Sequence, residues 1–117
     1  MNKKQRTSLI NAGWRLLDSS FNAKTNVVKV NVGNNLQHET AKFIKSFELI
    51  KGGHTIITEA IFKNGGRADI FCIDTLQIFE ILHSEKLSDA QKKEGYYPEE
   101  CEIFYLKSEE VLNEKNT

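Results

Sequence analysis

Apolar residues recur at helical spacing in two segments of the chain. The first segment, residues 6–17, places its apolar residues on one helical face: Leu9, Ile10, Trp14 and Leu17. The second, residues 35–51, carries a longer apolar stripe: Leu36, Phe43, Phe47 and Ile50. Asparagines at its start and two glycines after its end supply the caps of a helix. We expect this stripe to be buried, with Glu39 at its border with solvent and Lys42 one step further out.

Residues of high β-propensity alternate or cluster in five other segments. The predicted strands cover residues 27–32, 54–62, 67–73, 76–82 and 101–106. Short connections between the middle three favour an antiparallel meander. Weaker helical patterns cover residues 84–94, with Ser84 as the cap, and residues 108–114. From residue 35 the order is therefore α-β-β-β-α-β, which predicts an α/β fold with a mixed sheet flanked by helices.

Length and composition indicate one ordinary globular domain. The 117 residues suffice for a hydrophobic core, and 39% hydrophobic with 27% charged residues excludes a disordered or fibrous chain. No apolar run reaches the length of a membrane span, and polar residues interrupt the N-terminal segment where a secretory signal would be unbroken. Cys72 and Cys101 are too few for a disulfide scaffold, so we expect reduced thiols in a cytoplasmic protein that has no membrane partner.

Charge is balanced overall but not along the chain. The formal net charge is zero, yet residues 1–34 carry +5, residues 35–84 carry −1 and residues 85–117 carry −4. We divide the single domain accordingly into a basic N-terminal segment (1–34), a core (35–106) and an acidic tail (107–117). A basic segment can contact phosphate or remain solvated, and the sequence leaves both roles open.

Four acidic residues lie in or beside the predicted apolar elements: Glu39, Glu59, Asp69 and Glu80. A carboxylate placed in an apolar strand loses hydration, and a divalent cation such as Mg²⁺ offsets that loss when several oxygens converge on it. The alternative for each is a position on the solvent face of a half-covered sheet, and we prefer it for Glu59. For Asp69 and Glu80 together, the order in which they follow the helix glutamate favours a metal site.

That order resembles the PD-(D/E)XK nuclease superfamily, in which a helix glutamate precedes a strand aspartate and an E-x-K motif in the next strand. The matching segments are QHETAK (37–42), TEA (58–60), GRADIF (66–71) and FEILHSE (79–85). The resemblance covers residues 35–106 and is typical of small archaeal, phage-type and junction-resolvase-like members. It implies a restriction-endonuclease-like core and a DNA endonuclease that depends on Mg²⁺ or Mn²⁺. The implied metal ligands are Asp69, Glu80 and the main-chain carbonyl of Ile81, with Glu39 acting directly or through a water.

One residue departs from the family pattern. Leu82 occupies the position of the E-x-K lysine, and a leucine cannot orient water or stabilise charge on a phosphate. Family members relocate this lysine, and Lys42, three residues after Glu39, is the first replacement; Lys86 and Lys92 are others. The catalytic residues predicted in this way are Glu39, Asp69, Glu80 and Lys42.

The missing lysine keeps other functions open. The chain is either a nuclease, a non-catalytic nuclease fold used for DNA binding or protein assembly, or an interaction module that binds no nucleic acid. For a nuclease, we expect a homodimer because a small chain has little surface for a duplex. We expect His38 and His83 to be structural, Arg67 to contact either a phosphate or an acid, and Trp14, Tyr96 and Tyr97 to pack rather than stack on bases.

Overall fold

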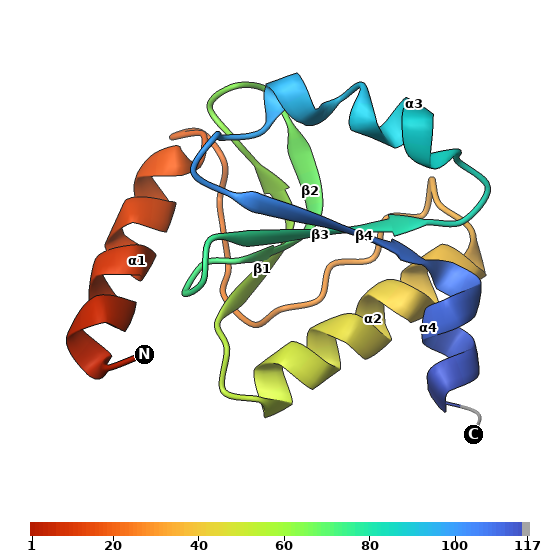
Figure 1. Ribbon diagram of the computed structural model, residues 1–117, viewed down its shortest axis with the longest axis horizontal. Coiled ribbons are helices and arrows are strands. Elements are labelled where there is room, and N and C mark those ends of the chain that lie inside the picture. Colours follow the sequence, from red (N-terminus) through yellow and green to blue (C-terminus); the bar gives the residue numbers. More distant parts are fainter. Residues whose placement is uncertain (116–117) are drawn as a thin grey trace.

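The computed structural model describes residues 1–115, so the last two residues of the predicted acidic tail lie outside the described residues. A four-stranded mixed sheet is flanked by helices (Figure 1). The elements in chain order are α1 (Lys3–Leu16), α2 (Leu36–Lys51), β1 (Ile56–Ile61), β2 (Arg67–Cys72), β3 (Gln77–Leu82), α3 (Leu87–Gln91), the 3-10 turn η1 (Glu94–Tyr96), β4 (Glu102–Lys107) and α4 (Ser108–Lys115). None of the described helices has both the length and the apolar character required to cross a bilayer.

The strands follow one another across the sheet in the order β1-β2-β3-β4. β1, β2 and β3 pair antiparallel, which confirms the predicted meander, and β4 pairs parallel to β3. A parallel neighbour requires the chain to cross back over the sheet, and the segment containing α3 and η1 makes that crossing. The predicted α/β class and mixed sheet flanked by helices are therefore confirmed.

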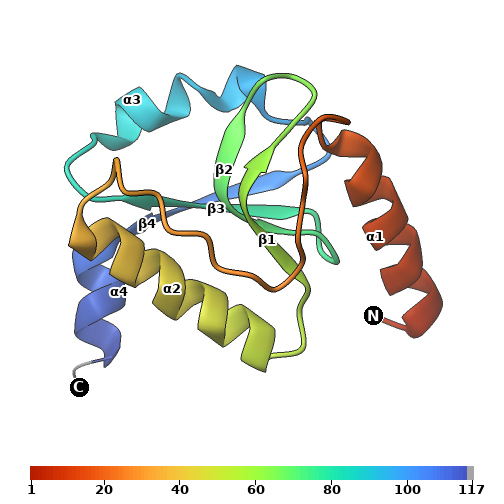
Figure 2. The same ribbon diagram turned by 180° about the vertical axis from the view of Figure 1, so that it is seen from behind.

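Different helices cover the two faces of the sheet (Figures 1 and 2). On one face, α1 approaches closely because its Gly13 has no side chain; an added Cβ would lie 2.4 Å from Ile73 Cγ1. On the other face, Leu49 and Ile50 of α2 pack against a buried cluster of strand residues: Ile56, Ile70, Cys72 and Phe79. α4 lies beside the N-terminal half of α2, where Val111 meets Ala41 and Ile81.

The predicted strand at residues 27–32 is wrong. This segment runs along the free edge of β1 but bonds largely to the Thr58 side chain instead of to a backbone ladder. The Lys29 N–H donates to Thr58 Oγ1 at 2.9 Å, and that hydroxyl donates to the Val27 carbonyl at 2.8 Å. The alternating valines do not enter a core, since Val30 and Val32 are 73% and 94% exposed. The segment covers an edge strand without extending the sheet.

The buried face of α2 is also different from the predicted one. The helix begins after Asn35, whose side chain accepts from the His38 N–H, and ends at Gly52, as the caps indicated. Its apolar stripe, however, is largely exposed: Leu36 is 78%, Phe43 53% and Phe47 55% exposed. The helix instead buries four other residues: His38, Ala41, Lys42 and Ser46. The face of α2 that lies against the sheet and α4 therefore combines these residues with the partly buried Ile44, Leu49 and Ile50.

The helix predicted over residues 84–94 is shorter in the structure. α3 spans only Leu87–Gln91, and Lys86 rather than Ser84 takes the N-cap position without a side-chain hydrogen bond. Ala90 is its one buried residue, so little packing energy extends the helix beyond a turn and a half. The chain continues through the separate turn η1 into Tyr97 and Pro98, which are buried.

Candidate active site

Three acidic side chains form one row across the sheet. Glu59 of β1 lies between Thr58 and Ala60, whose register partners in β2 lie on either side of Asp69. Glu80 of β3 follows Phe79, which pairs with the residue after Asp69. The backbone ladder between β2 and β3 stops one residue short of this row, at the pair Ile70–Phe79. The two strands are therefore open where Asp69 and Glu80 meet.

Asp69 and Glu80 close this gap with their side chains. The Asp69 N–H donates to Glu80 Oε1 at 3.2 Å, and the Ile81 N–H donates to Asp69 Oδ2 at 2.8 Å. Burial, together with the charge of the adjacent Asp69 carboxylate, raises the pKa of Glu80 to about 8. Glu80 forms no ion pair with any described residue, so two acidic groups share a site that lacks enough positive charge for both.

His38 connects the N-terminus of α2 to this pair. Its Nδ1 lies 2.7 Å from Glu39 Oε2, and its Nε2 lies 3.4 Å from Asp69 Oδ2. The hydrogen bond to Asp69 and, less strongly, the contact with Glu39 raise the pKa of His38 to about 9 against the effect of burial. The protonated imidazole therefore donates a hydrogen bond from Nδ1 to Glu39 and forms an ion pair through Nε2 with Asp69. His38 thus bridges Glu39 and Asp69, and the expectation that it is structural stays a prediction.

Glu39 is the most completely hydrogen-bonded acid of the site. Its carboxylate accepts from the Asn31 N–H at 2.6 Å, from Asn34 Nδ2 at 3.3 Å, from His38 Nδ1 and from Lys42 Nζ. Burial alone would raise its pKa, but these donors, with Lys42 the strongest, lower the pKa of Glu39 to about 2. Because all these donors bind the Glu39 carboxylate, it holds His38 and Lys42 in fixed positions, which suits a positioning role.

Lys42 lies beneath the helix and not on its solvent side. Its side chain is 1% exposed, and its Nζ lies 2.7 Å from Glu39 Oε1 and 3.9 Å from Glu59 Oε2. Glu59 adopts a φ of 51°, a left-handed conformation that is rare for a residue with a side chain and uncommon inside a strand. Such strain tends to persist at functional sites, where surrounding contacts hold it.

Two further lysines, Lys92 and Lys93, lie just beyond α3, and both are exposed. Lys92 is exposed and pairs with Asp89 at 3.5 Å. Lys93, which sequence reasoning did not single out, pairs with Glu85 at 2.9 Å. Its pKa is raised first by that bond and also by the charge of Glu80, so it is near the site. Spacing gave no signal for it because the chain leaves α3 before residue 93.

The predicted residues therefore fall into two connected groups. The gap between β2 and β3 brings together Asp69, Glu80 and Ile81. The second group is Glu39 and Lys42, which pair with each other on α2. His38 joins the groups. Leu82, at the family's lysine position, is buried at 5% exposure.

A second cluster lies at the other end of β2. The ligand atoms of His54, Cys72 and Asp74 all lie within 4.8 Å of one another and could hold a metal ion. Asp74 is already paired with Arg6 of α1 at 3.3 Å and accepts from the Cys72 thiol at 3.1 Å. Burial raises the pKa of Cys72 to about 12, which keeps that thiol protonated. The contact between Arg6 and Asp74 anchors α1 to the sheet.

Comparison of the chain with models of protein families, with curated proteins and with solved structures found no significant match.

Proposed function

We propose that this protein is a DNA endonuclease that depends on a divalent cation, Mg²⁺ or Mn²⁺, and that its sheet and helices form a restriction-endonuclease-like core. One observation carries the proposal. Asp69 and Glu80 meet in an opening between two strands, and Glu80 has no ion-pair partner among the described residues. Two adjacent carboxyl groups repel each other when both are ionised, and either a proton on Glu80 or a cation bound between them relieves that repulsion.

The chemistry of the available donors fits a hard cation. Asp69 and Glu80 supply carboxylate oxygens, and the Ile81 N–H points toward Asp69. A residue in a strand directs its N–H and its C=O to the same side, so the Ile81 carbonyl faces the same gap. Three oxygen donors from two strands suit Mg²⁺ or Mn²⁺ better than zinc.

The remaining residues hold this arrangement in place. His38 pairs with Asp69 and donates to Glu39, and Lys42 donates to Glu39. This chain of contacts fixes the Asp69 carboxylate relative to α2, so that substrate and cation meet a preformed set of oxygens. When bound, a divalent cation supplies Lewis-acid activation of water and of the phosphodiester.

The test is cleavage of labelled duplex and branched DNA with Mg²⁺, Mn²⁺ or EDTA. Wild type should cut only with metal, and Asp69→Asn and Glu80→Gln should lose at least about 100-fold in rate. Asp89→Asn is the matched control, because it is the same acid-to-amide change on an exposed surface pair. If Asp69→Asn cleaves DNA at the wild-type rate, this pair is not the active site. Circular dichroism checks that each variant is folded.

A second function has its own supporting observation. Lys42 is occupied by Glu39 and Glu59, and Leu82 replaces the motif lysine, so neither position offers a free ammonium to a phosphate. A non-catalytic nuclease fold that binds DNA or assembles with protein would need none. This alternative would be favoured if the protein binds DNA in the absence of metal and cleaves it with none of the metals tested.

We further propose that the protein is a homodimer. Leu36, Phe43 and Phe47 lie along one line of α2 and are each more than half exposed. Soluble monomers rarely expose an apolar stripe of this kind, and a twofold axis along it would let the stripe cover its own copy. Two antiparallel α2 helices would also oppose their dipoles.

A further inference from the structure

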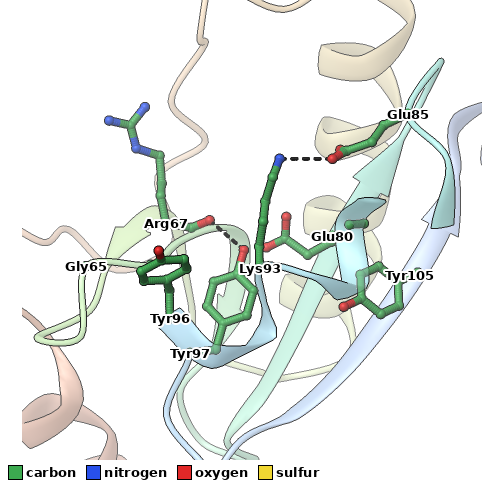
Figure 3. A pocket seen from close by; sticks show the side chains of 10 residues that line it. Gly65, Arg67, Glu80, Glu85, Lys93, Tyr96, Tyr97 and Tyr105 are labelled. Carbon is green, nitrogen blue, oxygen red and sulfur yellow. Dashed lines mark hydrogen bonds and ion pairs between the residues drawn. The ribbon is translucent and has the colours of Figure 1, made fainter. Parts of the chain in front are cut away.

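A pocket of about 550 Å³ opens directly beside Glu80 (Figure 3). Its walls come from three places in the chain: the β1–β2 turn at residues 65–67, the segment 85–97, and Tyr105 of β4. This volume falls in the range that encloses one small ligand and is far too small for the width of a duplex. Whatever enters it lies next to the proposed metal ligands.

The aromatic wall of the pocket is held rigidly by the turn. Gly66 packs so closely that an added Cβ would lie 2.3 Å from the Tyr96 carbonyl oxygen, and its N–H donates to that oxygen at 3.1 Å. The Tyr97 hydroxyl donates to the Arg67 carbonyl at 3.0 Å. Because backbone contacts fix residues 96 and 97, the pocket exists before a ligand arrives.

Two tyrosine rings at the pocket remain available for stacking. Tyr96 is 59% exposed, although large aromatic residues are usually covered. Tyr105 lies across Glu80 and Lys93 from Tyr96 (Figure 3). Its hydroxyl donates a hydrogen bond to Glu94 at 2.6 Å. Exposed tyrosine rings suit a flat ligand, and stacking of a base on an aromatic residue contributes about 1–3 kcal/mol.

The charges of the pocket separate its floor from its rim. Glu80 lies at the floor, where its carboxyl can accept from the amino group of a base. Glu85 lies further out, at 37% side-chain exposure, and its carboxylate is paired with Lys93 at 2.9 Å. Arg67 lies at the rim, and its exposed guanidinium makes no hydrogen bond or ion pair with any described residue. A guanidinium of this kind suits a phosphate oxygen at the pocket mouth.

We infer that this pocket binds one unpaired nucleotide of the DNA substrate, with its base against Tyr96 and its phosphate at Arg67. A base within a duplex presents only its edges, so it must leave the stack before its face can meet a ring. The preferred substrate is therefore DNA with a single-stranded or displaced nucleotide beside the cut. The position of that cut rests on the proposed nuclease function, whereas binding in the pocket can be tested without cleavage.

The probe is a DNA duplex with a single-stranded overhang whose first unpaired base is 2-aminopurine, compared with the same duplex fully paired. Binding is followed by fluorescence quenching in EDTA at about 0.1 M salt, so no cleavage occurs. The overhang probe should bind with quenching and the paired probe more weakly. Tyr96→Ala should weaken overhang binding about tenfold, while Tyr96→Phe, which keeps the ring, should stay close to wild type.

Arg67→Ala should also weaken overhang binding, whereas Arg15→Ala, an exposed arginine on α1, should not. Equal binding of both probes, or unchanged binding in both Tyr96→Ala and Arg67→Ala, would overturn the inference even if the protein cuts DNA. Selective overhang binding lost in these variants, with no cleavage under any metal, would support the pocket and refute the nuclease. Thermal melts confirm that each variant is folded.

Discussion

Replacement of the buried Lys42 by methionine should destabilise the protein far more than an ordinary lysine substitution. Methionine retains most of the side-chain stem, so the change removes mainly the ammonium group. Without that group, the carboxylates of Glu39 and Glu59 lose their shared cation while remaining largely covered, at 11% and 14% side-chain exposure. Removing one partner of a buried ion pair leaves an uncompensated charge, which is the expensive case.

The expected loss is about 3 kcal/mol. Breaking a buried pair typically costs about 3–5 kcal/mol, and the lower end applies because Glu39 keeps donors from Asn31, Asn34 and His38. For a domain of this size, each kcal/mol shifts the melting temperature by about 4 °C. We therefore expect Lys42→Met to melt about 12 °C below wild type.

Urea unfolding followed by circular dichroism measures this difference, with Lys92→Met as the matched control. Lys92 pairs with Asp89 but is 78% exposed, so its loss should change stability by less than about 1 kcal/mol. Adding Glu39→Gln to Lys42→Met removes one of the stranded charges and should restore at least about 1 kcal/mol. If Lys42→Met and Lys92→Met are equally stable, Lys42 is not the buried ion-pair partner described above.

Three further predictions concern separate parts of the molecule. The pKa of Glu39 is lowered from 4.5 to about 2, so its ionised form stabilises the fold above about pH 4.5 and that stabilisation is lost as the pH falls toward 2. Urea unfolding of Glu39→Gln should therefore depend less on pH over this range than that of wild type, and parallel curves would contradict the argument. Gly66→Ala should lose about 1–3 kcal/mol in urea unfolding, because the new Cβ meets fixed backbone, whereas Gly95→Ala meets nothing within 4 Å and should be near neutral. Phe43→Ser combined with Phe47→Ser should convert a dimer into a monomer in light scattering, and a monomeric wild type would refute the dimer.

The strands and their order could be predicted because local signals agree there. β1 is rich in β-branched residues, short apolar runs define β2 and β3, and tight connections allow little besides an antiparallel meander. The following helix and final strand then require a crossover, which places β4 parallel to β3. Asp69 and Glu80 could be singled out for the same reason, since each interrupts an apolar strand.

The rotation of α2 could not be predicted from its pattern. Periodicity shows which residues share a face, but not which face meets the sheet. Here the apolar line through Leu36, Phe43 and Phe47 would have been the natural inner face, and the structure exposes it. Contacts that bury Lys42 and His38 depend on Glu59 and Asp69, which are distant in sequence. No window along the helix contains those partners.

Stability alone does not account for the orientation of α2. A helix that turned Phe43 and Phe47 inward would gain apolar burial worth about 1.5–3 kcal/mol per side chain and would leave Lys42 hydrated. The observed orientation gives up that gain and buries an ammonium, a carboxylate and an imidazole, which must all be paired to be tolerated. Proteins retain such arrangements where function requires polar groups at fixed positions. A protein selected only for packing would improve when Glu39 and Lys42 are both replaced by apolar residues. If this site is catalytic, those replacements can raise stability but must lower the cleavage rate. His38 then loses the Glu39 carboxylate that positions it beside Asp69.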